Sequence, residues 1–426
     1  MKRYLSCAVA LMMALIACTG CYSYRDTNRV LFMTMGICDE KNGQLQFFCE
    51  AFKAYRGEGE KAGKEKRVAY FGKGVNLSEA ARDVRIAVNY PVDYSGNKSF
   101  VFTQRMAENG LETTLDLLGR DQKPSMRTYL FIFNGDASDL ASVTMEDEEF
   151  MGFYLYEMMN SNKYTLGILP NQYYQFVKNL RTGSGINLLP LLETETIEQE
   201  AAVLPEEKPP EEQQGKQQEQ GSGKEQEEGG KQSSGEQRQQ DSASPFLQSS
   251  AQLERPYIAV KGAAILQKSR MVGVLNPDEL ETFNLMTAKV KSGIISMPNP
   301  SEKDALASFS VLGNKYKSKV SMAGERIKLD FTTTVRVVLI DVGPSFTGDR
   351  TSAQQLEKEL EEVLAARALA LFERMQKENI DIFDVKRKLE LAHTPIQSDD
   401  FLQQVDFSIN VDVIIDGLGI LKASYY

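Results

Sequence analysis

A long polar segment divides this chain and limits what the rest of it can fold into. Between residues 206 and 245 the sequence is built from Gln, Glu, Gly, Ser, Lys and Pro and is almost free of aliphatic and aromatic side chains. Such a segment buries too little apolar surface to offset its ordering entropy, so we expect residues 196–252 to be a disordered linker or insertion. A polar binding tract is the alternative interpretation. Folded structure is expected on either side, in residues 21–195 and 253–426.

Composition excludes several classes of function. The chain has 426 residues, enough for several domains, and a formal net charge of -10, which argues against nucleic acid as a partner. It has one histidine, His393, so a zinc site built on two or three histidines within the chain is excluded. No CxxC…CxxC pattern with zinc spacing is present. All five cysteines lie within the first 49 residues, and the one CxxC, at residues 18–21, follows an apolar run rather than opening a helix.

The N-terminus has the pattern of a secretory signal peptide. Lys2 and Arg3 are followed by residues 4–17, which are mostly apolar and uncharged. At about 1.5 Å per residue this run is too short to cross a hydrocarbon core of about 30 Å. We therefore expect residues 1–20 to be a signal peptide rather than a membrane span.

Two cysteines follow the apolar run, and a small residue precedes each of them. Ala17 precedes Cys18, and Gly20 precedes Cys21. A small residue followed by cysteine at this place is typical of bacterial lipoproteins, in which the thiol carries diacylglycerol and tethers the chain to a membrane. The local sequence Leu15-Ile16-Ala17 favours Cys18 as the lipid-bearing residue. A cleaved signal with incidental cysteines is the alternative.

The first folded region begins with a predicted hairpin. Residues 31–38 and 45–55 read as strands, and Asn42-Gly43 between them is a strong turn signal. A turn centred there places Cys38 opposite Phe47 and Cys49 opposite Gly36. The two thiols would then be diagonal neighbours, so we expect buried free thiols rather than a disulfide.

Alternating strands and helices follow in the same region. Ser78 is the expected cap of the first helix. The expected elements are a helix at 77–89, a strand near 99–104, a helix at 110–120, a buried strand within 127–136, and helices near 146–160 and 171–181. This alternation predicts an α/β or α+β domain.

The second folded region shows clearer periodicity. A long helix at 352–378 has one apolar stripe, and Ser352 with Gln355 fits a capping box. Residues 406–419 alternate strictly, as in a sheet solvated on one face. The other expected elements are strands at 257–266 and 271–275 around a turn at 267–270, a helix at 277–290 that begins with Pro277, and a strand at 327–343. A division near residue 300 into two subdomains, about 253–300 and 301–426, is the alternative to a single region.

No sequence motif indicates catalysis. GxxxxGK[ST], GxSxG, HExxH and an EF-hand loop are all absent. His393 could serve as a base, but no nucleophile or oxyanion loop accompanies it, so we interpret it as a loop residue before Pro395. We predict no catalytic residue, no metal site and no cofactor.

Several short motifs occur in an order that resembles a known family. In the C-terminal half they are GAAILQKSRMVGVLNPDE at 262–279 and Asp381-Ile382-Phe383. In the N-terminal half they are Gly20-Cys21-Tyr22, Gly36-Ile37-Cys38-Asp39, Ala107, Gly110, Leu115-Asp116 and Arg120-Asp121. Together they resemble the Ger(x)C family, the lipoprotein C subunits of spore nutrient germinant receptors. The family usually has Trp where Tyr22 stands, and the polar segment is not a recognisable family feature.

The resemblance implies a fold, a location and partners. It implies an α+β (mixed α/β) fold of several domains, each a mixed sheet flanked by helices, and a non-enzymatic role in nutrient-triggered germination. The chain would be held by lipid on the extracytoplasmic face of the spore inner membrane and act with integral-membrane A-type and B-type receptor subunits. The family places the acylated cysteine at Cys21, with Cys18 as the alternative. An extracytoplasmic lipoprotein that binds a small nutrient by itself is the alternative function.

Overall fold

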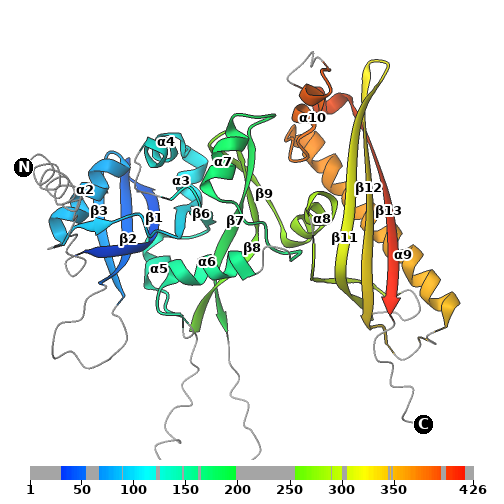
Figure 1. Ribbon diagram of the computed structural model, residues 1–426, viewed down its shortest axis with the longest axis horizontal. Coiled ribbons are helices and arrows are strands. Elements are labelled where there is room, and N and C mark those ends of the chain that lie inside the picture. Colours follow the sequence, from blue (N-terminus) through cyan, green and yellow to red (C-terminus); the bar gives the residue numbers. More distant parts are fainter. Residues whose placement is uncertain are drawn as a thin grey trace, which may run out of the picture. The chain divides into compact units, whose positions relative to one another are not determined.

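The described residues form two β-sheets with flanking helices. The structure is a computed structural model that describes residues 30–53, 67–88, 90–120, 125–145, 148–161, 165–197, 255–288, 290–299, 305–343, 346, 349–394 and 400–417. Two mixed sheets with helices confirm the predicted α+β (mixed α/β) class (Figure 1). The predicted signal peptide, Cys18, Cys21 and most of the polar segment lie outside the described residues.

The first sheet has nine strands in the order β3-β2-β1-β5-β6-β7-β8-β9, with β4 paired to β1. β5 runs parallel to β1 and to β6, and β6 is parallel to β7, while β2 and β3 are antiparallel additions at one edge. The strands are β1 (Leu31–Lys41), β2 (Gln44–Lys53), β3 (Val68–Gly74), β4 (Val92–Asp93), β5 (Ser99–Thr103), β6 (Tyr129–Phe133), β7 (Ile186–Ile197), β8 (Arg255–Gln267) and β9 (Arg270–Leu275).

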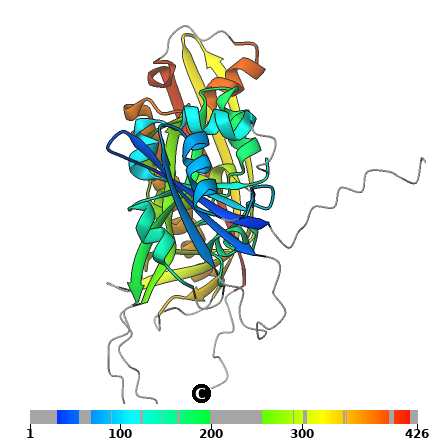
Figure 2. The same ribbon diagram turned by 90° about the vertical axis from the view of Figure 1, so that its left-hand side faces the viewer.

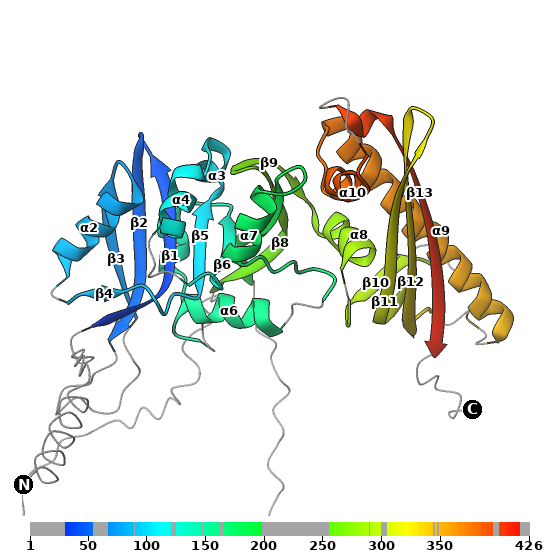
Figure 3. The same cartoon turned by 45° about the horizontal axis from the view of Figure 1, so that its top comes forward.

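Helices cover both faces of the first sheet. One face packs against α2 (Leu77–Ala87), α3 (Gln104–Asn109), α4 (Glu112–Arg120) and α7 (Tyr173–Leu180). The opposite face packs against α5 (Ala137–Ser142) and α6 (Met151–Ser161), and the views of Figures 1 and 3 show this layering. All five residues of β5 and all five of β6 are buried, which is why YLFIF is a continuous apolar run and SFVFT is polar only at its two ends.

The β1–β2 hairpin forms as the sequence predicts. Asn42 and Gly43 adopt φ angles of 55° and 71°, the left-handed region that a tight two-residue turn requires. Cys38 pairs with Phe47, and Gly36 pairs with Cys49, so the expected register is confirmed. Both thiols are buried and free, and their burial raises the pKa of each. The blue strands of this hairpin face the viewer in Figure 2, with the lighter blue α2 against them.

The strands on either side of the polar segment are neighbours in the first sheet. β7 ends where the segment begins, β8 starts where it ends, and the two are hydrogen-bonded to each other. Glu195 on β7 accepts a hydrogen bond from the Tyr257 hydroxyl and pairs with the Lys261 ammonium, both on β8. β8 and β9 therefore complete the sheet that the residues before the segment begin. The limits of the predicted domains, 21–195 and 253–426, remain predictions.

The second sheet has four strands in the order β10-β11-β12-β13. β13 runs parallel to β12, and the connection between them contains the long helix α9. The elements after β9 are α8 (Pro277–Thr287), β10 (Ile294–Pro298), β11 (Leu306–Ala323), β12 (Arg326–Asp341), α9 (Arg350–Glu378), α10 (Val385–Leu391), the 3-10 turn η2 (Phe401–Gln404) and β13 (Val405–Gly417).

The second sheet is covered on one face. Leu356, Leu360 and Leu364 of α9 pack against the inner residues of β10 to β13. Along β12 buried residues alternate with exposed or half-buried ones, and Val411 and Val413 are buried on β13. The prediction of a sheet solvated on one side is therefore confirmed.

Two predicted helix caps are wrong. Asn76 caps α2, and its side chain accepts a hydrogen bond from the Glu79 amide at 3.0 Å, while Ser78 lies inside the helix. Asp349 caps α9 and accepts from the Ser352 amide at 2.8 Å, so Ser352 lies inside the first turn. In both cases a stronger side-chain acceptor one or more residues earlier takes the cap position. Pro277 does begin α8, as predicted.

Candidate functional site

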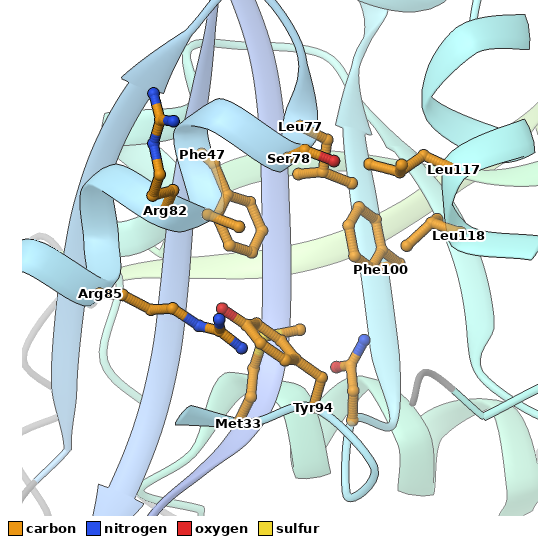
Figure 4. Close-up of a pocket in the computed structure, with 12 residues that line it drawn as sticks. Met33, Phe47, Leu77, Ser78, Arg82, Arg85, Tyr94, Phe100, Leu117 and Leu118 are labelled. Atoms are coloured by element: carbon orange, nitrogen blue, oxygen red, sulfur yellow. The ribbon is translucent and has the colours of Figure 1, made fainter. Parts of the chain in front are cut away.

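A cavity of about 290 Å³ lies between α2, α4 and the first sheet (Figure 4). The side chains that line it come from the elements around it. α2 contributes one side of the helix along its length, and β1, β2 and β5 contribute neighbouring residues on one face of the sheet. The lining residues are Met33, Phe47, Leu77, Ser78, Ala81, Arg82, Arg85, Tyr94, Asn97, Phe100, Leu117 and Leu118.

Two stacked phenylalanines form part of the cavity wall. The ring centroids of Phe47 and Phe100 are 6.2 Å apart, and the planes differ by 14°. They lie on β2 and β5, on either side of β1, and Gly36 of β1 lies beneath them. A Cβ atom at Gly36 would be 2.9 Å from a ring carbon of Phe100 and 3.0 Å from one of Phe47. Glycine at this position therefore lets the two rings approach across the middle strand.

A polar turn places one buried amide in the wall. The Asn97 backbone amide donates to the Tyr94 carbonyl at 3.2 Å, and the Asn97 carbonyl accepts from the Thr128 hydroxyl at 3.0 Å. These bonds hold a turn that leads directly into the buried strand β5. The Asn97 side chain is only 2% exposed, yet neither its Nδ2 nor its Oδ1 atom has a hydrogen-bond partner among the described residues. A buried amide without partners is costly, so this side chain needs a polar group from outside the protein or from solvent.

The solvent side of the cavity is cationic. Arg82 and Arg85 on α2 are exposed and line it, and no acidic residue does. In Figure 4 the Arg85 guanidinium extends toward Tyr94, whereas Arg82 points away from the cavity. The site thus combines an apolar interior, one buried amide and a positively charged rim.

A second polar cluster lies where β1 and β5 end. Asp39 is fully buried, and its carboxylate accepts hydrogen bonds from the Thr103 hydroxyl at 2.7 Å and from the Arg105 guanidinium at 2.8 Å. Arg105 also binds Asp136, which pairs with Lys41 at 2.9 Å. Hydrogen bonds from Lys41 and Arg105 lower the pKa of Asp136, and those to Asp39 and Asp136 raise the pKa of Arg105. This cluster ties three strand ends together through paired charges, so we interpret it as structural.

A third cluster lies on the opposite face of the sheet. The Arg67 Nε atom is 2.5 Å from the buried Glu50 carboxylate, and the Glu50 oxygens also accept from the Met151 and Gly152 amides at the start of α6. Arg67 donates further to the carbonyls of Val143 and Ala141. The carboxylate at a helix N-terminus is favourable for the helix dipole. This arrangement explains the position of α6 and is structural.

The remaining candidate residues do not come together. His393 is exposed just after α10, with φ at 54°, and its amide donates to the Glu390 carbonyl. Among the described residues, no group of three or more His, Cys, Asp and Glu side chains could hold a metal ion. No helix within the described ranges is long and apolar enough to cross a membrane. Cys21 and Cys18, the predicted lipid-bearing residues, fall outside the described residues, so their role remains a prediction.

The sequence did not point to the cavity, because its residues come from five separate elements. The one available signal was an Asn placed two residues before a strand whose three central residues are all apolar. Residues 94–97 (YSGN) are a turn sequence, and β5 begins at Ser99. An amide so close to a buried strand is normally either exposed or hydrogen-bonded. The Asn97 side chain is buried and has no hydrogen-bond partner among the described residues.

The structure defines an α+β protein with two mixed sheets and flanking helices. Comparison with protein families then gives the family. Residues 23–194 match the spore germination protein N-terminal domain, and residues 261–419 match the domain described as "Spore germination B3/ GerAC like, C-terminal". The chain therefore belongs to the GerAC-like (Ger(x)C) family of spore germination proteins.

Individual relatives are distant. A Bacillus subtilis (strain 168) protein named YfkR, provisionally described as a spore germination protein, is 20% identical over 155 residues, which are 35% of this chain and 40% of YfkR. The alignment thus spans less than half of that relative. The crystal structure of the GerBC protein matches with a TM-score of 0.51 and 15% identity, over 89% of this chain and 96% of GerBC. At that identity the likeness shows a shared fold.

Proposed function

We propose that this chain is the lipid-anchored C subunit of a spore nutrient germinant receptor. The observation that carries the proposal is the match of both family domains, in order, on either side of the polar segment. The N-terminal match begins at residue 23, two residues after Cys21. A family match that begins this close to Cys21 supports a mature chain that starts at Cys21.

The subunit acts through protein contacts rather than catalysis. Its partners are the integral-membrane A-type and B-type receptor subunits, and its place is the extracytoplasmic face of the spore inner membrane. Lipid on Cys21 holds the folded part at that surface, with Cys18 as the alternative attachment. Two acyl chains suffice for stable anchoring, whereas one alone gives marginal binding.

A pair of matched variants tests the anchor. Cys21→Ala should move the chain from the membrane fraction to the soluble fraction of disrupted spores, because no thiol remains at position 21 to carry the lipid. Cys18→Ala is the control and should stay with the membrane. The opposite pattern would assign the lipid to Cys18. Retention of both variants, and of the double variant, would show that lipid is not the anchor.

Co-purification tests the partners. A tagged chain extracted from spore membranes in mild detergent should bring down multi-spanning subunits in comparable amounts. A chain that elutes alone after gentle extraction would contradict the receptor assignment.

A second function, direct binding of a small molecule, is favoured by one specific observation, the cavity with the unpartnered Asn97 amide.

A further inference from the structure

We propose that the cavity between α2, α4 and the first sheet binds a small amphipathic carboxylate, with its apolar body against the wall that contains Phe47 and Phe100 and its carboxylate at Arg85. The inference goes beyond the role in a receptor complex and does not depend on lipid anchoring or on the receptor partners. It rests on four independent features of the cavity: its size, its apolar wall, its buried amide and its charge.

Size limits the ligand. The volume is about 290 Å³, and at about 30 Å³ for each water-sized group this holds about ten non-hydrogen atoms. That excludes a peptide or an oligosaccharide as the whole occupant. It suits a single small molecule, at the lower end of the volumes that ligand pockets have.

The wall selects an apolar body. Phe47 and Phe100 are 1% and 2% exposed, and Met33, Leu77 and Leu118 complete the buried surface around them. Polar groups of a sugar would lose their hydration against these side chains without replacement. A flat or branched hydrocarbon group gains contact with the aromatic faces instead.

The buried amide selects a polar group on the same ligand. Asn97 has one donor group and one acceptor, both within the cavity wall and both without a partner among the described residues. Its backbone is fixed by Tyr94 and Thr128, so the side chain cannot leave the wall without breaking the turn. A ligand oxygen that accepts from Nδ2 satisfies the donor, and ordered water can satisfy the acceptor.

Charge selects an anion. Arg82 and Arg85 line the cavity, and no Asp or Glu among the described residues does, although the whole chain carries a net charge of -10. Arg82 has Glu79 as an ion partner at 3.9 Å, whereas Arg85 has no ion pair with a described carboxylate. Arg85 also extends toward Tyr94 in Figure 4, at the side of the cavity where a ligand head group would meet it. A guanidinium binds a carboxylate with two parallel hydrogen bonds, which an ammonium ligand cannot accept.

Three probes of nearly equal size separate these features. 3-Phenylpropanoate, 3-phenylpropanamide and 3-phenylpropylamine share the phenyl group and differ in the head group, which is anionic, neutral or cationic; the amine also lacks the carbonyl oxygen. Isothermal titration calorimetry of the full chain in detergent, with a blank titration into detergent alone, measures each of them. We expect saturable binding of one carboxylate per chain and binding of the amine weaker by at least about tenfold.

Variants assign the roles of the two polar residues. Asn97→Leu should weaken all three probes by about tenfold or more while leaving the melting temperature equal or higher, because it removes an unsatisfied amide. Arg85→Gln should remove the preference for the carboxylate over the amide. Arg82→Gln is the matched control on the same helix and should keep that preference.

Three results would overturn the proposal. The first is the absence of saturable heat for the carboxylate up to about 10 mM. The others are binding of the amine as tight as that of the carboxylate, and unchanged binding of the probes by the Asn97→Leu variant. Should Asn97→Leu fail to fold, Ala81→Phe fills the cavity from the α2 side and must abolish binding. Carboxylate binding that persists in Ala81→Phe would place the ligand elsewhere and contradict the assignment.

Discussion

The two sheets of this protein differ in how helices cover their faces. The first sheet is covered by helices on both faces and encloses charged groups, such as Glu50, which is 3% exposed, and the fully buried Asp39. The second is covered by α8 and α9 on one face, and its outer face carries exposed ion pairs such as Arg326 with Asp406. The core of the first sheet therefore includes charged groups, whereas the charges of the second sheet lie mostly at the surface.

The difference also decides where a ligand site can exist. A one-sided sheet offers solvent a polar face and keeps its apolar residues in one core. A sheet between two helical layers leaves spaces where helices of unequal length meet the strands, and the Asn97 cavity lies in such a space. The following substitutions test this comparison, from the largest expected effect to the smallest.

Arg67→Met should give the largest loss of stability. The substitution leaves the Glu50 carboxylate buried without its cation, so we expect the free energy of unfolding to fall by about 4 kcal/mol. Urea denaturation followed by circular dichroism measures it. A loss below about 1 kcal/mol would show that Glu50 is solvated or neutral in the folded protein.

Leu360→Ala tests the one-sided core of the second sheet. Leu360 is fully buried between α9 and the strands, and its truncation leaves a cavity, so we expect a loss of about 3 kcal/mol. Leu369→Ala is the control on the same helix, since Leu369 is 43% exposed. Equal losses in the two variants would mean that α9 does not pack on the sheet through the Leu360 side.

Gly36→Ala tests the wall of the cavity. The added methyl group would lie 2.9 Å from the Phe100 ring, so the stacked phenylalanines must separate, at a cost of about 2 kcal/mol. Gly43→Ala is not a matched control, because Gly43 has a positive φ. Gly96→Ala is the control, since a Cβ atom added there would have only one neighbouring atom, at 3.6 Å. Thermal melting of the Gly36 and Gly96 variants compares them, and a Gly36→Ala protein as stable as the parent would contradict the described ring contact.

Arg326→Met is the surface counterpart of Arg67→Met and should have the smallest effect. Its hydrogen bonds lower the pKa of Asp406. A lowered pKa means that this pair stabilises the fold above the unfolded-state pKa and that the contribution disappears as the pH falls through the folded-state pKa. Both side chains are 53% exposed, so solvent screens the pair and its contribution is small. We therefore expect a change in melting temperature at pH 7 that is too small to measure, and none at pH 2. A change at pH 7 as large as that of Arg67→Met would erase the distinction between the sheets.

Sequence patterns predicted the elements whose periodicity was intact. The hairpin with Asn42-Gly43, the buried run at 129–133 and the alternating β12 and β13 were all recognisable, because each reflects one burial pattern over its whole length. β11 was not predicted, since its buried alternation ends at Val311 and the residues after it are exposed or half-buried. The short helices α3 and α5 were also missed, because six residues show too little of a helical period.

Long-range pairing could not be predicted from the sequence. Nothing local shows that β7 and β8 are neighbours, because the polar segment separates them along the chain and their pairing is decided in the folded sheet. The same holds for the cavity, which depends on Met33, Phe47, Asn97 and Phe100 meeting across three strands and a turn. The Cys38 and Cys49 register was predictable because a two-residue turn fixes it.

The most direct test of the central claim is the mass of the N-terminal peptide of the chain isolated from spore membranes. The account predicts that the mature chain begins at Cys21 and that this residue carries diacylglycerol on its sulfur. A mature N-terminus at Cys18 with the same modification would move the anchor by three residues. A membrane-isolated chain in which Cys18 and Cys21 are both unmodified would contradict the proposal of a lipid-anchored receptor subunit.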